Sequence, residues 1–428
     1  MRMEEAVGTA ILGMDTLWGG DAMCASGTGR FIADSWFGDE PLPEAYTLAE
    51  AAAVRASGGV SAKTPDRAAI DAYLAKVDIP GAIEALKGRG EYLAGLALCF
   101  ETMWDLAMEI LGRGARVPYD RCVLASCAQA PEASDPREKR DRVAALLDAS
   151  GDVPAAVDAW RAGHRVPMAS IRLLGAAAIG HFDALTAANV TPHLPAEWRT
   201  VPRANIEFLP IRDAWFSGSM NYLGRKRRPD GSPEYEATYE INASLEISLP
   251  EFLQLVSHEV VPGHVTTFAY LQNLYWRRKV GFEASVLTMN TRAAALFEGI
   301  ANHAILMAYG VTEVDQLPDR DLRIGVSLAL LQDDAKNQSS FLTWGEGAAQ
   351  AEVAKALRRD FLVSEERADK LSGAWGRHPL LGRMYLPAYR AGTRKVADLR
   401  RRYAAEKVLP ALYGANGLVD VATVERAI

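Results

Sequence analysis

The spacing of apolar residues, every three or four positions, is the feature that most limits how this chain of 428 residues can fold. Four windows of the first half show it, at about residues 65–77, 80–112, 135–150 and 153–188. Such spacing places apolar side chains on one face of an α-helix. Thr64 and Pro65 form a clear start signal, because threonine caps helices and proline fits their first turn. The sequence therefore predicts a mainly α protein.

A different pattern interrupts the helices between about residues 198 and 248. Residues 204–209 and 238–243 alternate and are typical of strands, so we expect a small antiparallel β-sheet there. Helical spacing returns at Pro250 and continues almost to the C-terminus, with breaks at Gly310, Pro318 and residues 373–379. We expect one domain over residues 1–428, with a helical half over about 1–197 and a catalytic half over about 198–428.

Charge and composition argue against several classes of function. The 47 basic and 54 acidic residues give a net charge of -7, and the one short basic run, residues 225–228, reads as a turn, so nucleic acid is not an expected partner. The four cysteines lack the paired spacing of a zinc or redox motif: Cys24, Cys99, Cys122 and Cys127. The first 20 residues lack the features of an export signal, and no apolar run approaches the roughly 20 residues that span a bilayer. We therefore expect a cytoplasmic protein without a membrane partner. The sequence does not set its oligomeric state.

Residues 258–264, which read H-E-V-V-P-G-H, carry the strongest chemical signal because they hold two of the seven histidines beside a glutamate. In metal-dependent hydrolases a histidine binds the ion, and the neighbouring glutamate takes a proton from the bound water, whose pKa falls to about 7. We therefore expect His258 and His264 to be metal ligands and Glu259 to be the general base.

The spacing of these histidines differs from that of an ordinary zinc-binding helix. The usual second ligand comes four residues after the first, and that position is Pro262 here. In a regular helix His264 would point about 120° away from the face of His258. Because proline lacks an amide donor and glycine accepts unusual backbone angles, we expect a bulge or kink at Pro262 and Gly263 that turns His264 toward the ion. In a straight helix the two histidines would be ordinary polar residues.

A third ligand is expected in the helical segment that begins at residue 293. Glu298 stands there in an otherwise apolar stretch, where an unpaired carboxylate would be costly. Metal coordination removes that cost, as would an ion pair with Arg292, and we favour coordination. His303 lies five residues further on, about 140° around the helix. We expect His303 to contact a ligand or the substrate rather than the ion.

These motifs resemble those of a large bacterial family known as domain of unknown function 885, related to zinc carboxypeptidases of the Taq type and to the zincins. The family patterns H-E-x-x-P-G-H-H, E-G-x-A and Y-x-x-G match residues 258–264, 298–301 and 389–392, and the likeness covers roughly residues 204–403. The resemblance implies a zincin-like helical metallopeptidase fold with the small sheet beside the metal-binding helix. It implies Zn²⁺, although Mn²⁺ or Fe²⁺ would suit the same ligands. Val265 replaces the second histidine of the family's pair. Asn302 and His303 stand where the family usually has aromatic and acidic residues, so the substrate preference does not transfer.

The resemblance also implies roles for residues outside the metal site. By similarity to zincins, the strand of residues 239–243, with Tyr239 and Asn242, should lie at the edge of the cleft and pair with an extended substrate. Tyr389 or Tyr385 would donate a hydrogen bond to the oxyanion, although simple packing explains either tyrosine as well. Three arginines could bind a substrate carboxylate, or be solvated instead: Arg383, Arg390 and Arg394.

The function we favour is hydrolysis of a peptide or small amide, in which Glu259 passes a proton to the leaving nitrogen. Two other hypotheses stay open. Two histidines and one carboxylate also form the site of non-haem iron oxygenases, in which Glu259 would have no obvious task. The chain could also be a helical binding protein that has kept the site and lost the activity. The peptide end attacked is not set by the sequence.

Overall fold

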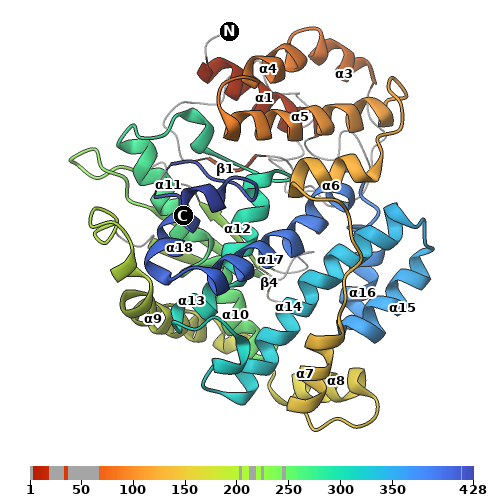
Figure 1. Cartoon of the computed structure of the whole chain (residues 1–428), viewed down its shortest axis with the longest axis vertical. Coiled ribbons are helices and arrows are strands. Elements are labelled where there is room, and N and C mark those ends of the chain that lie inside the picture. The colour runs from red at the N-terminus through yellow and green to blue at the C-terminus, as the bar shows by residue number, and fades with distance from the viewer. Residues whose placement is uncertain are drawn as a thin grey trace.

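The computed structural model describes residues 3–18, 33–36, 67–201, 205–211, 218–222, 226–242, 247–415 and 417–428. Helices make up most of this part of the chain (Figure 1), which confirms the prediction of a mainly α protein. Several residues used in the sequence predictions lie outside the described residues: Cys24, Thr64, Pro65, Ala204, Arg225 and Ala243.

The N-terminal helices lie together at one end of the molecule (Figure 1). They are α1 (Met3–Trp18), α3 (Arg67–Leu74), α4 (Ile79–Leu86), α5 (Glu91–Ile110) and α6 (Tyr119–Cys127). Asp78 caps α4 by accepting a hydrogen bond from the amide of Gly81. Gly88 and Gly90 have positive φ angles between α4 and α5. The single window predicted over residues 80–112 is therefore two helices, since glycine readily adopts this backbone conformation.

The next helices correspond to the windows predicted at residues 135–150 and 153–188. They are α7 (Arg137–Leu146), α8 (Val153–Gly163) and α9 (Ile171–Asn189). The second window is interrupted, because α8 ends at Gly163 and a short 3-10 turn, Met168–Ser170, precedes α9. Helices α7 and α8 share a hydrophobic core with helices from the C-terminal half.

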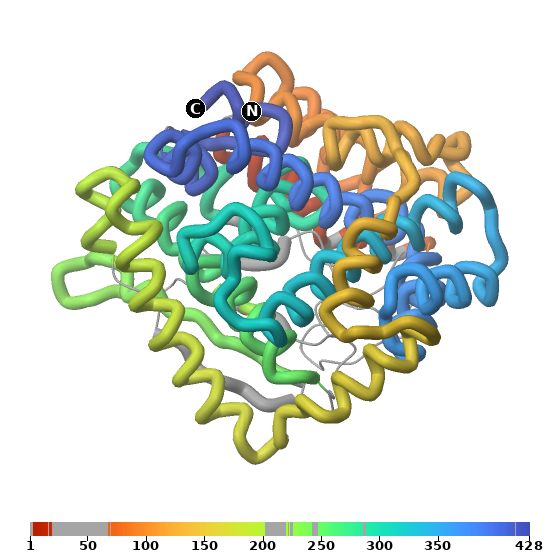
Figure 2. The backbone as a smooth tube through the Cα atoms, turned by 60° about the horizontal axis from the view of Figure 1, so that its bottom comes forward, coloured from red at the N-terminus to blue at the C-terminus, as the bar shows by residue number. Residues whose placement is uncertain are grey.

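Three strands form a mixed sheet that packs with α9 and with the helices that follow it (Figure 2). They are β2 (Asn205–Ile211), β3 (Gly218–Tyr222) and β4 (Glu236–Asn242), in the order β2-β4-β3. Strand β3 is antiparallel to β4, but β2 is parallel to it. The prediction of an antiparallel sheet is therefore wrong for the pair β2–β4. The two pairs differ because β4 lies between two strands that run in opposite directions. A separate antiparallel pair joins β1 (Ala33–Trp36) to β5 (Val286–Thr288).

The position of β4 corrects a second prediction. Tyr239 is paired with Phe208 of β2 on one side and with Met220 of β3 on the other. The backbone of a central strand is already hydrogen-bonded on both sides. The expectation that the strand of residues 239–243 pairs with an extended substrate is therefore wrong for the described residues of β4.

The C-terminal half supplies the helices that carry the candidate site. They are α10 (Leu249–Glu259), α11 (His264–Trp276), α12 (Arg292–Asn302), α13 (Ala304–Ala308), α14 (Arg320–Ser340), α15 (Gln350–Phe361), α16 (Glu365–Ser372), α17 (Leu386–Arg402) and α18 (Ala405–Leu412). The breaks predicted at Gly310, Pro318 and residues 373–379 all fall between helices. Helices α12, α14 and α17 run through the middle of the molecule (Figure 1).

Two glycines set how closely α12 and α17 approach each other. A Cβ on Gly392 of α17 would collide with the carbonyl oxygen of Ala295, and a Cβ on Gly299 of α12 would collide with the backbone of Gly392. The helices therefore cross backbone to backbone, at positions where a larger residue does not fit. This crossing fixes Glu298, beside Gly299, relative to the residues at the start of α17.

Candidate metal centre

The two histidines are brought together by a break between helices rather than by a kink within one. Helix α10 ends at Glu259, and α11 begins at His264 after a cis peptide bond between Val261 and Pro262. The rings of His258 and His264 lie 4.8 Å apart, centroid to centroid, and are perpendicular to each other. The predicted distortion at Pro262 and Gly263 is thus present in a stronger form, because the chain leaves the helix completely.

The break is held in place by contacts of its own backbone. The Gly263 amide donates a hydrogen bond to the carbonyl oxygen of Ser257 at 3.1 Å. A Cβ on Gly263 would collide with the carbonyl of His258, so this close return of the chain needs glycine. Tyr413, which follows α18, donates its hydroxyl to the carbonyl oxygen of Pro262 at 2.8 Å. These contacts aim His264 back toward His258.

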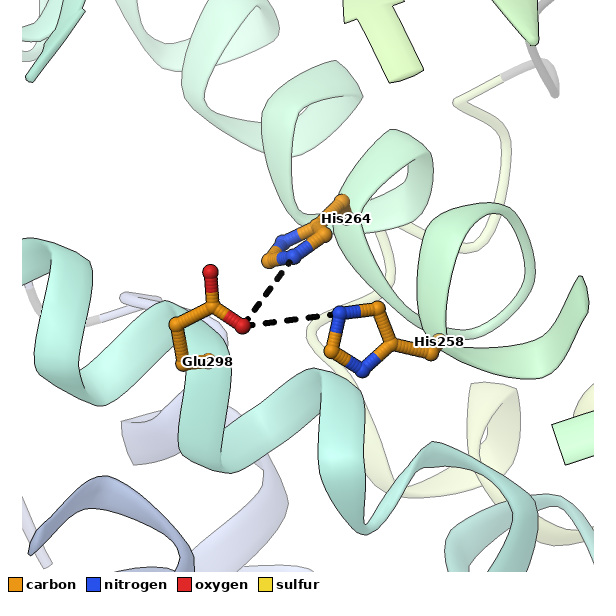
Figure 3. Close-up of side chains that lie close together, drawn as sticks. All are labelled: His258, His264 and Glu298. Carbon is orange, nitrogen blue, oxygen red and sulfur yellow. Dashed lines mark ion pairs between the residues drawn. The ribbon is translucent and has the colours of Figure 1, made fainter. Parts of the chain in front are cut away.

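Glu298 completes a three-residue group with the two histidines (Figure 3). Its Oε2 lies 3.5 Å from Nε2 of His258 and 3.8 Å from Nε2 of His264. The three candidate ligand atoms lie within 4.8 Å of one another. The structure therefore gathers the three residues that the sequence predicts as metal ligands.

The donor set fits a divalent metal ion such as zinc. Ligand atoms about 2.0–2.2 Å from a tetrahedral zinc ion lie roughly 3.3–3.6 Å from one another, close to the separations measured from Glu298. Its Oε1 accepts a hydrogen bond from Tyr385 at 2.5 Å. Its Oε2 is buried and accepts no hydrogen bond from the described residues. A buried carboxylate oxygen aimed at two imidazole nitrogens is the arrangement that a cation would satisfy.

The ionisation states of two of these residues also suit a metal ion. Burial, together with the charge of His264, lowers the pKa of His258 to about 3, so the His258 ring is neutral near pH 7. Burial alone would raise the pKa of Glu298, but the interactions with His264 and the charges of His258 and Lys336 together outweigh it and lower this pKa to about 2. A neutral imidazole and an ionised carboxylate are the forms that bind metal ions.

Glu259, the predicted general base, lies beside this group. Its Oε1 is 3.9 Å from Nε2 of His258, and the residue is 9% exposed. Tyr239 of β4 is completely buried next to it: burial raises the pKa of the tyrosine, and the charge of Glu259 adds to the increase. The side chain of Asn242 lies outside the described part of the strand.

Both predicted tyrosines reach the group from the start of α17, and the structure gives them different surroundings. Tyr385 donates its hydroxyl to Glu298, while Tyr389 packs against Tyr385 with ring centroids 5.1 Å apart. Burial raises the pKa of each phenol well above its usual value, so both are hydrogen-bond donors near pH 7. Tyr385 therefore orients Glu298, whereas Tyr389 packs against Tyr385.

A chain of buried polar residues behind His258 is absent from the sequence predictions. The Asn302 side chain interacts with His258 and donates a hydrogen bond to the hydroxyl of Thr393 at 2.9 Å. Thr393 in turn donates to Asp333 at 3.3 Å, and Lys336 donates to the other oxygen of Asp333 at 3.3 Å. The signal was available in residues 332–340, where Q-D-D-A-K-N-Q-S-S stands inside a helical window. Polar residues that dense are ordinarily solvent-exposed, and only the tertiary structure shows that they are buried.

Four other predicted site residues lie away from the three candidate ligands. Arg383 is buried in a bidentate ion pair with Glu109, both distances being 3.0 Å. Arg390 and Arg394 both pair with Glu132. Nδ1 of His303 donates a hydrogen bond to the carbonyl oxygen of Gly299, 3.1 Å away. Together with Arg390 and Arg394 it lines a separate cavity of about 800 Å³, whose described lining includes none of the three candidate ligands.

Comparisons with known proteins find similar solved structures but no matching family. No protein-family profile matches the chain, and no curated protein does. Two of the solved structures that match share 16% sequence identity each with this chain. One is a candidate lipoprotein from Colwellia psychrerythraea, with a TM-score of 0.53 over 84% of this chain and 61% of that one. The other is a candidate lipoprotein of unknown function from Shewanella oneidensis, with a TM-score of 0.52 over 89% of this chain and 77% of that one. This chain thus spans less than two thirds of the first of them.

These matches correct the predicted cytoplasmic location. Both similar structures are described as candidate lipoproteins, and this finding contradicts the cytoplasmic default drawn from composition. Within the described residues, one helical stretch, Met168–His193, has the length and composition needed to cross a membrane. Its mean hydropathy is 1.2, and 28% of its most apolar window is buried. Core helices of soluble proteins meet the same criterion, so the expectation of no membrane partner stays a prediction.

Proposed function

We propose that this protein is a metal-dependent hydrolase that cleaves a peptide or related amide bond. The observation that carries the proposal is the convergence of His258, His264 and the buried Oε2 of Glu298, with Glu259 beside His258. Two imidazoles and one carboxylate are the protein ligands of several catalytic zinc sites, which keep a fourth position open for water or substrate. Zinc is the ion we propose, with manganese or iron compatible with the same donors.

Each residue of the group has a task in this reaction. A bound zinc ion would lower the pKa of a water molecule and polarise the substrate carbonyl. Glu259 would take the proton as the water oxygen bonds to the carbonyl carbon, and would give it to the nitrogen as the carbon–nitrogen bond breaks. Tyr385 would hold Glu298, which keeps its other oxygen directed at the histidines. Tyr389 is the phenol we assign to the negative charge that develops on the carbonyl oxygen.

The family resemblance is part of this proposal. The three motifs of the domain of unknown function 885 carry His258, Glu298 and Tyr389. His258 and Glu298 lie together, and Tyr389 packs against Tyr385, which holds Glu298. The glycines of the second and third motifs are the two at the crossing of α12 and α17. Those observations support, as a proposal, a zincin-like arrangement. In it, Gly299 and Gly392 are required so that α12, which carries Glu298, can contact α17, which carries Tyr389.

An iron oxygenase with the same three ligands is the competing hypothesis. The oxygenase hypothesis does not explain why Glu259 lies beside His258, because an oxygenase needs no general base there. The buried carboxylate at 3.9 Å from a ligand nitrogen therefore favours hydrolysis.

Removal and return of the metal tests the proposal. We expect the purified protein to hydrolyse members of a panel of short peptides and acylated amino acids, to lose at least about 100-fold of that rate after chelation, and to regain it with one equivalent of zinc. The measurement is the initial rate of amine release, with circular dichroism to show that the chelated protein is still folded. If chelated protein that holds no metal hydrolysed the panel as fast as untreated protein, the proposal would be overturned.

A further inference from the structure

Lys336 of α14 places a buried positive charge against the ring of Tyr389. The residue is 8% exposed, and its Nζ lies 3.2 Å from the centre of that ring. A cation on the face of an aromatic ring is attracted by the electrons of the ring, most strongly where water is excluded. Tyr389 in turn packs against Tyr385, which donates its hydroxyl to Glu298. The lysine is therefore the far end of a row of contacting side chains that ends at a candidate metal ligand.

A second contact holds the lysine in this position. Its Nζ donates a hydrogen bond to Oδ1 of Asp333 at 3.3 Å, and Oδ2 of Asp333 accepts one from Thr393 at 3.3 Å. Asp333 and Lys336 are three residues apart on α14, so they share one face of that helix. Tyr389 and Thr393 are four residues apart on α17 and also share a face. Helix α14 therefore contacts α17 twice, through the lysine at Tyr389 and through the aspartate at Thr393.

Stability alone does not account for a charge in this place. Taking an ammonium group and a carboxylate out of water is costly, and replacing a buried ion pair with apolar residues of similar volume often leaves a protein as stable or more stable. A methionine would fill the space of Lys336 without that cost, because its unbranched side chain adapts to irregular gaps. The charge itself therefore needs a reason, and its contact with Tyr389 supplies one.

We propose that Lys336 is a positioning residue for Tyr389, which it holds in place and makes a stronger hydrogen-bond donor toward the carbonyl oxygen of the substrate. This inference rests on the proposed hydrolase function, in which Tyr389 stabilises that oxygen. A positive charge on the ring face draws electrons away from the phenol oxygen, so its O–H group is more strongly polarised. Because the carbonyl oxygen becomes negative only as water adds, the effect is larger in the transition state than in the bound substrate. Lys336 itself gives up no proton and forms no bond in this step.

A double-mutant cycle with Tyr389 tests the proposal in the zinc-loaded protein. Y389F keeps the ring and removes the hydroxyl, so it should lower kcat by about 100-fold or more, as the loss of one oxyanion donor does. K336M should lower kcat by roughly 10- to 30-fold at an unchanged KM, the effect of losing one buried cation–π contact. In the Y389F background K336M should lower kcat by less than about threefold, because the hydroxyl on which the lysine acts is already gone. The measurements are kcat and KM with the best substrate of the panel, and the zinc content of each variant.

Two further lysine variants separate the charge from the side chain and from a general effect. K336R keeps a cation at the ring and should retain most of the kcat that K336M loses. K139M removes the lysine of α7 that pairs at 2.6 Å with Asp334, the neighbour of Asp333. Because Asp334 keeps a second partner, Arg390, at 3.2 Å, K139M should retain the wild-type kcat and KM. Should K336M not fold, D333N/K336M removes both buried charges together and takes its place in the cycle.

Failure of the positioning role differs from failure of the hydrolase. The role of Lys336 is overturned, and the hydrolase remains, if folded K336M or the double variant in its place keeps the wild-type kcat, loses its zinc, or loses the same factor with and without the Tyr389 hydroxyl. A Y389F protein with the wild-type kcat, or a K336R protein as slow as K336M, has the same consequence. If zinc-loaded wild-type protein hydrolyses no member of the panel, the hydrolase proposal fails and the role of Lys336 fails with it.

Discussion

Glu259→Gln should lower kcat for amide hydrolysis by about 100-fold or more while the protein keeps its metal ion, because a general base contributes roughly 10²–10⁴ to such a rate. Glutamine has the shape of glutamate but cannot take up the proton that must leave the attacking water. His258, His264 and Glu298 are untouched by the substitution, so metal affinity should change little. The measurements are kcat with the best substrate of the panel and the zinc content of the same preparation.

Glu366→Gln is the control for this variant. Glu366 forms an exposed i,i+4 pair with Lys370, with 70% of its side chain exposed, and such a pair contributes little to stability. The Glu366→Gln variant should retain the wild-type kcat. If Glu259→Gln retained full hydrolytic turnover, Glu259 would not be the general base. An oxygen-dependent turnover that survives the substitution would support the oxygenase hypothesis instead.

Gly392→Ala should destabilise the protein by about 1–3 kcal/mol or more, a typical cost of forcing extra atoms into a packed contact. The added methyl group would meet the carbonyl of Ala295 and push α17 away from α12. Because Glu298 lies on α12 and Tyr385 at the start of α17, the same displacement should weaken their hydrogen bond and lower zinc affinity. Urea denaturation gives the first effect, and zinc titration gives the second.

Gly180→Ala is the matched control for this change. Gly180 lies inside α9, and a Cβ there would meet nothing within 4 Å. Alanine is favoured over glycine in a helix, so this variant should be neutral or more stable by up to about 1 kcal/mol. A Gly392→Ala protein as stable as Gly180→Ala would contradict the backbone crossing of α12 and α17.

Local patterns predicted the helices and the residues that meet at the candidate site. The spacing of apolar residues located most helices, and the interruption at Pro262 and Gly263 indicated where the metal-binding helix had to be distorted. The direction of that distortion was not readable from the sequence, because it depends on contacts from distant residues. Ser257 and Tyr413 hold the break, and Tyr413 lies about 150 residues away along the chain.

What the sequence could not predict depends on tertiary neighbours. Tyr239 lies on a central strand because β4 lies between β2 and β3. The alternation of residue types within one strand does not indicate which strands are its neighbours. Arg383 was a plausible carboxylate ligand, but its partner Glu109 comes from α5, more than 270 residues earlier. From the sequence Lys336 would be taken for a surface lysine, but the structure buries it on α14.

The central claim, that residues 258, 264 and 298 hold one metal ion, is tested most directly by metal analysis of purified protein. Wild-type protein loaded with zinc and then desalted should contain one zinc ion per chain. H258A and H264A, each removing one ligand, should lose that ion while keeping the helical circular dichroism of the wild type, and Glu259→Gln should retain it. Folded wild-type protein that holds no stoichiometric metal after loading, or folded H258A and H264A proteins that hold as much as the wild type, would contradict the account.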